Sequence, residues 1–264
     1  MRSIILSLLA ALLCLAGSAG GQQIAPNPNW GYITLNGNGW YNNNFFFNNG
    51  TVFNGGTLTN HGTLSNNVAG TLQNYGTLTN YTGGTLTNNG TIDTTSATFT
   101  NNGTYRGSGH ISGSWTDHGH IKPGNSAGVM TMDGNYYKRG GSKEIELGGH
   151  FHGGGDNSLT EFDWLDVTGD VELAGTLEVY LINSFELLAG MSFEILNVGG
   201  ALTGEYDGLD EGHKVGSFSG TNLYITYAGG DGNDVTLFSR AVPEPTTLLL
   251  ALLGLALLPR RRRR

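Results

Sequence analysis

A short unit, Gly-Thr-Leu-x-Asn, recurs through the first half of the chain and constrains its fold more than any other feature. Its Gly-Thr pairs begin, at alternating spacings of six and eight residues, at Gly56, Gly62, Gly70, Gly76, Gly84 and Gly90. Two units therefore make a repeat of 14 residues. Such repeats are typical of solenoids, because one copy cannot bury its own apolar side chains and must stack on its neighbours.

Within each unit, polar and apolar residues alternate with the period of a β-strand. Leu58 should therefore face inward, while Thr57 and Thr59 face outward. Asn60 lies two residues after Leu58 and should also point inward, where stacked copies can form a ladder of amide hydrogen bonds. We expect an all-β fold, a parallel β-helix or β-solenoid, in which glycine supplies corner conformations of the backbone that a Cβ would obstruct.

The size of one coil is left open by the repeat. Three units sum to 20 or 22 residues, a plausible coil, but a flat two-sided coil of 14 residues is also compatible with the spacing. Disorder is the alternative for a segment rich in Asn, Gly and Thr. Disordered chains usually carry charge and lack periodic apolar residues, and this segment shows the reverse.

Residues 1–20 have the layout of a secretory signal peptide, with Arg2, an apolar run over 4–16 and small residues after it. Signal peptidase is therefore an expected partner. Cys14, the only cysteine, lies in this segment, so the mature chain is expected to have no disulfide.

The charge of the expected mature body is uneven. Residues 21–241 contain 7 Lys or Arg and 20 Asp or Glu, a net charge of −13, and only Asp93 among the acids precedes Arg106. A neutral first half is thus followed by an acidic second half. This surface repels phosphate backbones, so we exclude nucleic acid binding.

Aromatic residues are concentrated between residues 22 and 49, at Trp30, Tyr32, Trp40, Tyr41 and the run Phe45, Phe46 and Phe47. Such a cluster can cap a repeat array by covering its first core layer, or it can bind sugars by stacking on their rings. We expect the cap, over residues 21–49, with repeats over 50–109.

The tail combines three features in a fixed order. Val242, Pro243, Glu244 and Pro245 form a stiff, extended tetrapeptide, because each proline fixes its own φ and disfavours helix before it. A short hydrophobic helix is predicted next, as a membrane span formed by Thr246, Leu248, Leu249, Leu250, Leu252, Leu253, Leu255, Leu257 and Leu258. The chain closes with a basic cluster of Arg260, Arg261, Arg262, Arg263 and Arg264, which should stay cytoplasmic.

This layout resembles the PEP-CTERM sorting signal of Gram-negative bacteria, and it covers residues 241–264. The resemblance implies processing by an exosortase-type membrane enzyme, transient anchoring in the inner membrane, and delivery to the cell surface or an exopolysaccharide matrix. An ordinary C-terminal membrane anchor is the alternative.

The second half keeps the strand alternation but changes its motifs. It reads PGNSAG at 123–128, IEL at 145–147, DWLDVTG at 163–169 and LAGTLEV at 173–179. This succession resembles the passenger domains of autotransporters, which are right-handed parallel β-helices. We therefore expect the helix to continue over 110–240, ending in a cap of β-strands.

Several residues have spacings that suit chemistry. His118 with His120, and His150 with His152, are weak candidates for zinc or copper, because each pair would place both imidazoles on one strand face. Asp163 and Asp166 are candidates for a carboxylate pair. On a regular strand, however, residues three apart face opposite sides. Exposed loop histidines and structural acids are the alternatives, and we expect no metal, cofactor or catalytic set.

A single Gly-Gly-Asp-Gly-Asn-Asp stretch at 229–234 resembles one copy of a calcium-binding nonapeptide, but those sites need tandem copies. A turn before the last strand is the expected role.

These features together predict a secreted, surface- or matrix-associated structural or adhesive solenoid that contacts exopolysaccharide and is not an enzyme. Two alternatives remain. One is a carbohydrate-active enzyme on the same scaffold, and the other is a glycan- or ice-binding module that uses the threonine rows.

Overall fold

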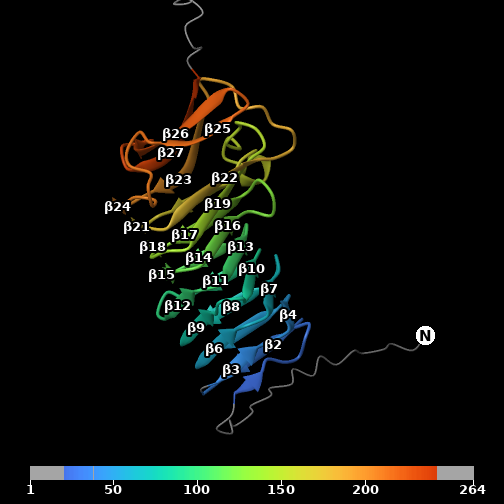
Figure 1. Cartoon of the computed structure of the whole chain (residues 1–264). Helices are drawn as coiled ribbons and strands as arrows, with labels where there is room; N and C mark the ends of the chain where they lie inside the picture. The colour runs from blue at the N-terminus through green and yellow to red at the C-terminus, as the bar shows by residue number, and fades with distance from the viewer. Residues whose placement is uncertain (1–20, 38, 243–264) are drawn as a thin grey trace, which may run out of the picture.

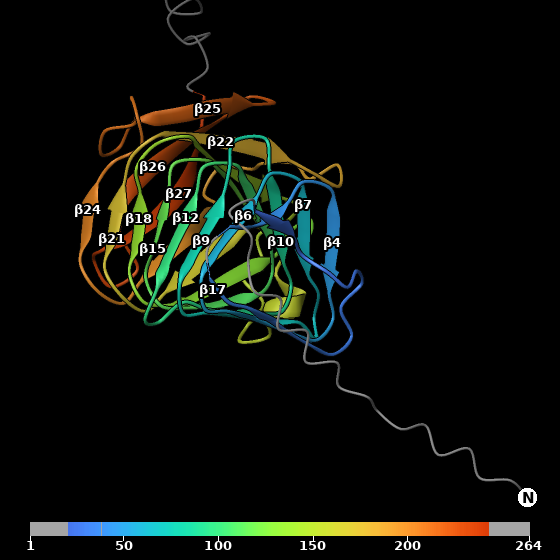
Figure 2. The same ribbon diagram turned by 90° about the horizontal axis from the view of Figure 1, so that it is seen from below.

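The computed structural model describes residues 21–37 and 39–242, and the architecture is a parallel β-solenoid with almost no helix. Consecutive short strands run along three sides in turn, and each strand pairs with its equivalent in the next coil. Figure 1 shows the elongated stack, and Figure 2 shows the strands surrounding one continuous core. The solenoid prediction is therefore confirmed.

Three sheets form these sides. Sheet A contains, in spatial order, β1 (Gln22–Gln23), β3 (Trp40–Asn42), β6 (Thr57–Asn60), β9 (Thr77–Asn80), β12 (Thr98–Asn101), β15 (Trp115–Asp117), β18 (Tyr136–Lys138), β21 (Val171–Leu173) and β24 (Leu202–Gly204). Sheet B contains β4 (Phe45–Asn48), β7 (Thr63–Asn66), β10 (Thr85–Asn88), β13 (Thr104–Gly107), β16 (His120–Pro123), β19 (Ser142–Leu147) and β22 (Thr176–Leu181).

Sheet C begins as a parallel sheet and ends in antiparallel strands. Its parallel part contains β2 (Tyr32–Leu35), β5 (Thr51–Asn54), β8 (Thr71–Asn74), β11 (Thr91–Asp93), β14 (His110–Ser112), β17 (Val129–Asp133), β20 (Trp164–Val167) and β23 (Ser192–Val198). The antiparallel part adds β27 (Asp234–Ala241), β26 (Thr221–Gly229) and β25 (Lys214–Phe218). The single short 3₁₀ helix in the described residues is η1 (Asn157–Leu159).

The register settles the coil length. Asn60 donates to Asn80, 20 residues on, and Asn66 donates to Asn88, 22 residues on, so both lengths occur. Three sheets exclude the flat two-sided coil. The inward column of apolar residues is also confirmed, since these side chains are at most 1% exposed: Leu58, Leu64, Leu72, Leu78, Leu86 and Ile92.

The repeat glycines have a different role from the one expected. None of the glycines that open a unit of the 14-residue repeat, from Gly56 to Gly90, has a positive φ. A Cβ on Gly56 would instead lie 1.5 Å from the carbonyl oxygen of Gly37, and one on Gly76 would lie 1.9 Å from that of Gly56. Glycine is therefore required because the backbones of successive coils approach closely at this corner.

The predicted amide ladder is present at all three corners. The longest ladder runs from Asn42 to Asn60, Asn80 and Asn101, and each Nδ2 donates to the Oδ1 of the next coil at 2.7–2.8 Å. A second ladder also links four asparagines, Asn29, Asn48, Asn66 and Asn88, and a short one joins Asn54 to Asn74.

The longest ladder ends in a buried ion pair. Asn101 donates to Asp117 at 2.6 Å, and the other carboxylate oxygen of Asp117 lies 2.7 Å from Nζ of Lys138. Both charged side chains have no exposed surface. Burial lowers the pKa of Lys138 below its ordinary value, and the attraction of the neighbouring Asp117 carboxylate offsets only part of this shift.

The prediction of an aromatic cap is not confirmed. Trp40 and Phe46 lie in the core. Four other aromatic side chains of the first coils are exposed to solvent: Trp30, Tyr32, Phe45 and Phe47. The outward-facing rings therefore leave the sugar-stacking interpretation open.

Replacing Asn80 by alanine should destabilise the fold, because it leaves the buried Oδ1 of Asn101 without its donor and removes the acceptor of Asn60. We expect a loss of about 2 to 4 kcal/mol in the free energy of unfolding, measured by urea denaturation. Asn102→Ala, at a half-exposed neighbour, is the matched control and should change it by less than about 0.5 kcal/mol. Equal effects of the two changes would contradict the role of the ladder.

Candidate functional site

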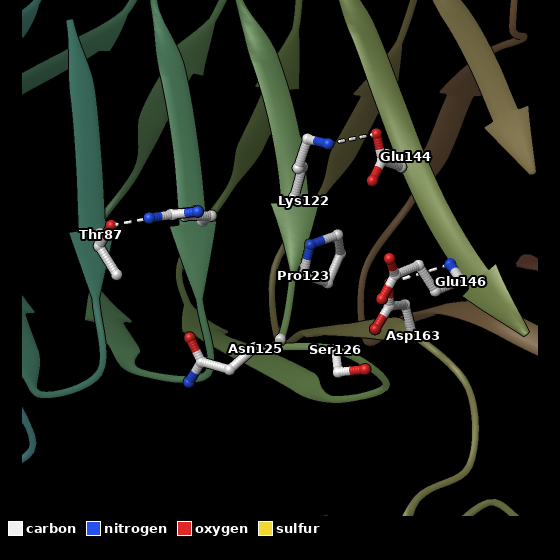
Figure 3. A pocket seen from close by; sticks show the side chains of 10 residues that line it. Thr87, Lys122, Pro123, Asn125, Ser126, Glu144, Glu146 and Asp163 are labelled. Atoms are coloured by element: carbon white, nitrogen blue, oxygen red, sulfur yellow. Dashed lines mark hydrogen bonds and ion pairs between the residues drawn. The ribbon is translucent and has the colours of Figure 1, made fainter. Parts of the chain in front are cut away.

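A polar groove of about 450 Å³ lies on the outward face of sheet B, where four successive strands meet the loop over residues 124–128. Its lining includes Arg106 on β13, Lys122 on β16, Glu144 and Glu146 on β19, and Asp163 just before β20. Figure 3 shows Lys122, Glu144, Glu146 and Asp163 near the loop that carries Asn125 and Ser126. The site therefore combines both signs of charge with amide and hydroxyl groups.

The loop that bounds the groove is the PGNSAG segment of the sequence. Gly124 has a φ of +79°, and Ser126 has a φ of +136°, so the chain reverses sharply after β16. The backbones of Gly124 and Gly128 approach so closely that a Cβ on either would lie within 2.7 Å of the other's Cα. Both glycines are therefore required by the turn.

Asp163 joins this loop to the neighbouring strand. Its two carboxylate oxygens accept hydrogen bonds from the backbone N–H of Gly128, at 2.8 Å, and of Glu146, at 2.9 Å. Three of the four autotransporter-like motifs thus converge on one buried side chain. These hydrogen bonds explain why the motifs are spaced as they are. They also agree with a structural role for Asp163, which the sequence left open as the alternative to catalysis.

Burial raises the pKa of Asp163 to about 8, because loss of solvation outweighs the two backbone hydrogen bonds that favour the anion. The nearby carboxylates of Glu146 and Glu144 also contribute to this raised value. At neutral pH the Asp163 carboxyl is therefore mainly protonated, and it lies beside an acidic side chain on the wall of the groove.

The basic side chains differ in their partners. Lys122 forms an ion pair with Glu144, which also lies 3.4 Å from Nε2 of His120. Nε of Arg106 donates to the hydroxyl of Thr87 at 3.0 Å, and within the described residues no carboxylate forms an ion pair with this guanidinium. Arg106 therefore keeps hydrogen-bond donors for a ligand.

The proposed carboxylate pair is not brought together. Asp163 lines the groove, whereas Asp166 lies on β20, where it accepts a hydrogen bond from Asn197 at 2.8 Å and does not line the groove. Glu146 lies near Asp163 instead. Strand alternation within the IEL motif puts Glu146 on the face opposite Ile145 and Leu147. Only the register between coils, however, shows that it lies beside Asp163.

The histidine pairs lie in different surroundings. His118 and His150 are exposed, whereas His120 is half-buried on β16 and the ring of His152 packs against Trp164 with centroids 4.1 Å apart. Within residues 21–37 and 39–242, no group of three or more His, Cys, Asp or Glu is arranged to hold a metal ion. Neither pair finds a third ligand in this part of the chain.

The Gly-Gly-Asp-Gly-Asn-Asp loop contacts the end of β23. Asp234 accepts a hydrogen bond from the backbone N–H of Val198 at 2.7 Å, and Asn233 donates to the carbonyl of Val198 at 3.0 Å. These contacts fasten the loop to the end of β23, which agrees with a structural role for the turn before the last strand.

The remaining predicted residues are those of the tail. Val242 is the last described residue, so Pro243, Glu244, Pro245, the predicted span and the arginine cluster lie outside the described residues. Across the described part of the chain, no helix has the length and apolar character needed to cross a bilayer. Comparison with protein-family models gave no match, and comparison with curated proteins gave none either.

The raised pKa of Asp163 gives a test by pH. The folded state holds this proton up to about pH 8, whereas the unfolded chain releases it near the ordinary aspartate pKa of 3.8. The contribution of Asp163 to stability is therefore most favourable at low pH and is lost as the pH rises through about 8. Asp163→Asn removes that dependence, so the stability of the wild type minus that of the variant should fall between pH 5 and pH 9.

Urea midpoints measured across this pH range check the expected trend. Asn125→Ala, a neutral change in the same loop, is the control and should leave the shape of the pH profile as in the wild type. A difference between the wild type and Asp163→Asn that is constant with pH would contradict the raised pKa.

Proposed function

We propose that this protein is a secreted, structural or adhesive solenoid of the cell surface or exopolysaccharide matrix of a Gram-negative bacterium. The observation that carries the proposal is the long solenoid body itself, with its polar outward faces. Its stacked coils hold outward side chains at fixed spacings of about 4.8 Å, which suits repeated contacts with an extended polymer.

Two features of the sequence support export and sorting. Residues 1–20 have the pattern of a secretory signal, and residues 241–264 resemble a PEP-CTERM signal with its proline motif, apolar run and arginine cluster. In this proposal, signal peptidase removes the first segment. An exosortase-type enzyme recognises the second while its apolar run is held transiently in the inner membrane.

Deleting residues 242–264 should release the protein from its normal location, because both the motif and the apolar run are lost. Immunoblots of cytoplasmic, membrane, surface and medium fractions measure the distribution. Retention at the surface after the deletion would contradict the proposal.

A second variant separates sorting from ordinary anchoring. Replacing Pro243, Glu244 and Pro245 by alanine leaves the apolar run and the arginines intact. An exosortase substrate should then accumulate uncut in the membrane, as shown by its mass. Wild type and variant that are both uncut and both held in the membrane would identify an ordinary anchor instead.

One observation favours a second candidate function, a carbohydrate-active enzyme. Asp163 and Glu146 line the same groove, and the raised pKa of Asp163 separates a protonated acid from a carboxylate, as acid–base hydrolysis of glycosides requires. Asp166, which the sequence analysis proposed as the partner of Asp163, is not part of this candidate site.

Activity is tested on the full chain with neutral and uronate polysaccharides, by assays for reducing sugars and unsaturated uronates. If the second candidate is right, product forms and Glu146→Gln lowers its rate by about 10²-fold or more. Product formation equal to that of a blank without protein would reject it and leave the structural proposal standing.

A further inference from the structure

The outward face of sheet B changes its chemistry along the solenoid axis. The register aligns Phe47 with Ser65, Ser65 with Thr87, Thr87 with Arg106, and Arg106 with Lys122. One row therefore passes from an aromatic ring through two hydroxyls to two cations. The parallel row begins at Phe45 and continues through threonines to His120.

Two aromatic rings stand exposed at the first strand of this face. Phe45 is 64% exposed and Phe47 is 41% exposed, and they lie two residues apart on β4, so they share the outward side. Their backbone is held in place, because the side chain of Asn27 bonds to the carbonyl of Phe45 and to the N–H of Phe47. Ordered strand backbone thus presents two apolar rings to solvent.

Hydrogen-bonding groups gather at the other end of the same face. The groove there holds donors on Arg106 and Lys122 and acceptors on Glu144 and Glu146. Since Asp163 is mainly protonated at neutral pH, these two cations and two anions compensate each other. A compensated groove suits sugar hydroxyls, which both donate and accept hydrogen bonds, better than a polyanion that would meet Glu146.

The distance between the two ends suits a polymer. The strands β4, β7, β10, β13, β16 and β19 are successive neighbours in sheet B. At about 4.8 Å per step, Arg106 on β13 lies roughly 14 Å, and Glu146 on β19 roughly 24 Å, from the rings on β4. A single sugar cannot contact both ends. An extended chain of several sugars along the solenoid axis can, and its contacts reinforce each other.

We propose that the outward face of sheet B, from Phe45 and Phe47 to the groove at Arg106 and Glu146, is a binding strip for a neutral polysaccharide. The two phenylalanine rings stack on the apolar faces of sugar rings, and Arg106 and Glu146 exchange hydrogen bonds with hydroxyl groups. The inference deepens the proposed matrix association and rests on it for its biological setting. Its test is independent, because binding by purified protein does not depend on localisation.

Binding is measured on the full chain, purified in mild detergent, against immobilised polysaccharides. The neutral probes are a soluble mixed-linkage β-glucan, dextran and galactomannan, and the acidic probe is alginate. We expect binding to at least one neutral probe that changes less than about twofold between 50 and 300 mM salt, since no net charge is neutralised.

Two variants test the strip. Phe45→Ala with Phe47→Ala, and separately Arg106→Gln, should each weaken this binding by about tenfold or more. Matched controls lie on the other faces. Arg139 is an exposed arginine that directly follows β18 of sheet A and pairs with Glu172, and Tyr75 is an exposed ring that stacks on Phe53 of sheet C. Arg139→Gln and Tyr75→Ala should bind as the wild type does.

Circular dichroism and the urea midpoint establish that each variant is folded. Failure of the wild type to bind any neutral probe overturns the proposal. Salt-sensitive binding to alginate alone overturns the neutral class, and equal losses in the control variants overturn the assignment to sheet B. None of these outcomes affects whether surface localisation depends on residues 242–264. The binding proposal can therefore fail while the sorting proposal stands, and the reverse.

Discussion

Hydrogen bonds between asparagine side chains, repeated from coil to coil, are the interaction on which the first half of this structure depends. Each inward amide donates to the next coil and also to a backbone carbonyl, as Asn60 does to Asn80 and to Thr85. A buried amide without partners is costly, so one coil can hold its asparagine inside only when another coil stacks on it. The ladder therefore makes the coils mutually dependent and fixes their register.

The ladder also explains where the chain changes character. At the fifth rung of the longest ladder the amide is replaced by Asp117, whose charge is compensated by Lys138 one coil later. Beyond this point the interior contains a second buried amine, Lys143, whose pKa burial lowers to about 7. The second half thus replaces a uniform amide column with individually satisfied polar groups, and Asp163 is one of them.

Of the acids that line the groove within the described residues, Asp163 is the one whose pKa is strongly raised. Asp163 is needed to hold the loop over 124–128 against β19, and its burial follows from that structural role. The same burial keeps the groove electrically compensated at neutral pH. Asp163 therefore both holds the loop in place and sets the charge balance of the groove.

The sequence by itself determined the strands, the inward leucines and the inward asparagines, because a period of two and a fixed repeat are local properties that a coil length does not alter. It also marked Asp163, the threonine rows and the aromatic first segment. Only the tertiary structure decided the three-sided coil, the exposure of Phe45 and Phe47, and the meeting of Arg106, Glu146 and Asp163. These depend on which residues become neighbours when successive coils stack, and that register is set by contacts between distant parts of the chain, such as Arg106 with Lys122 and Gly128 with Asp163.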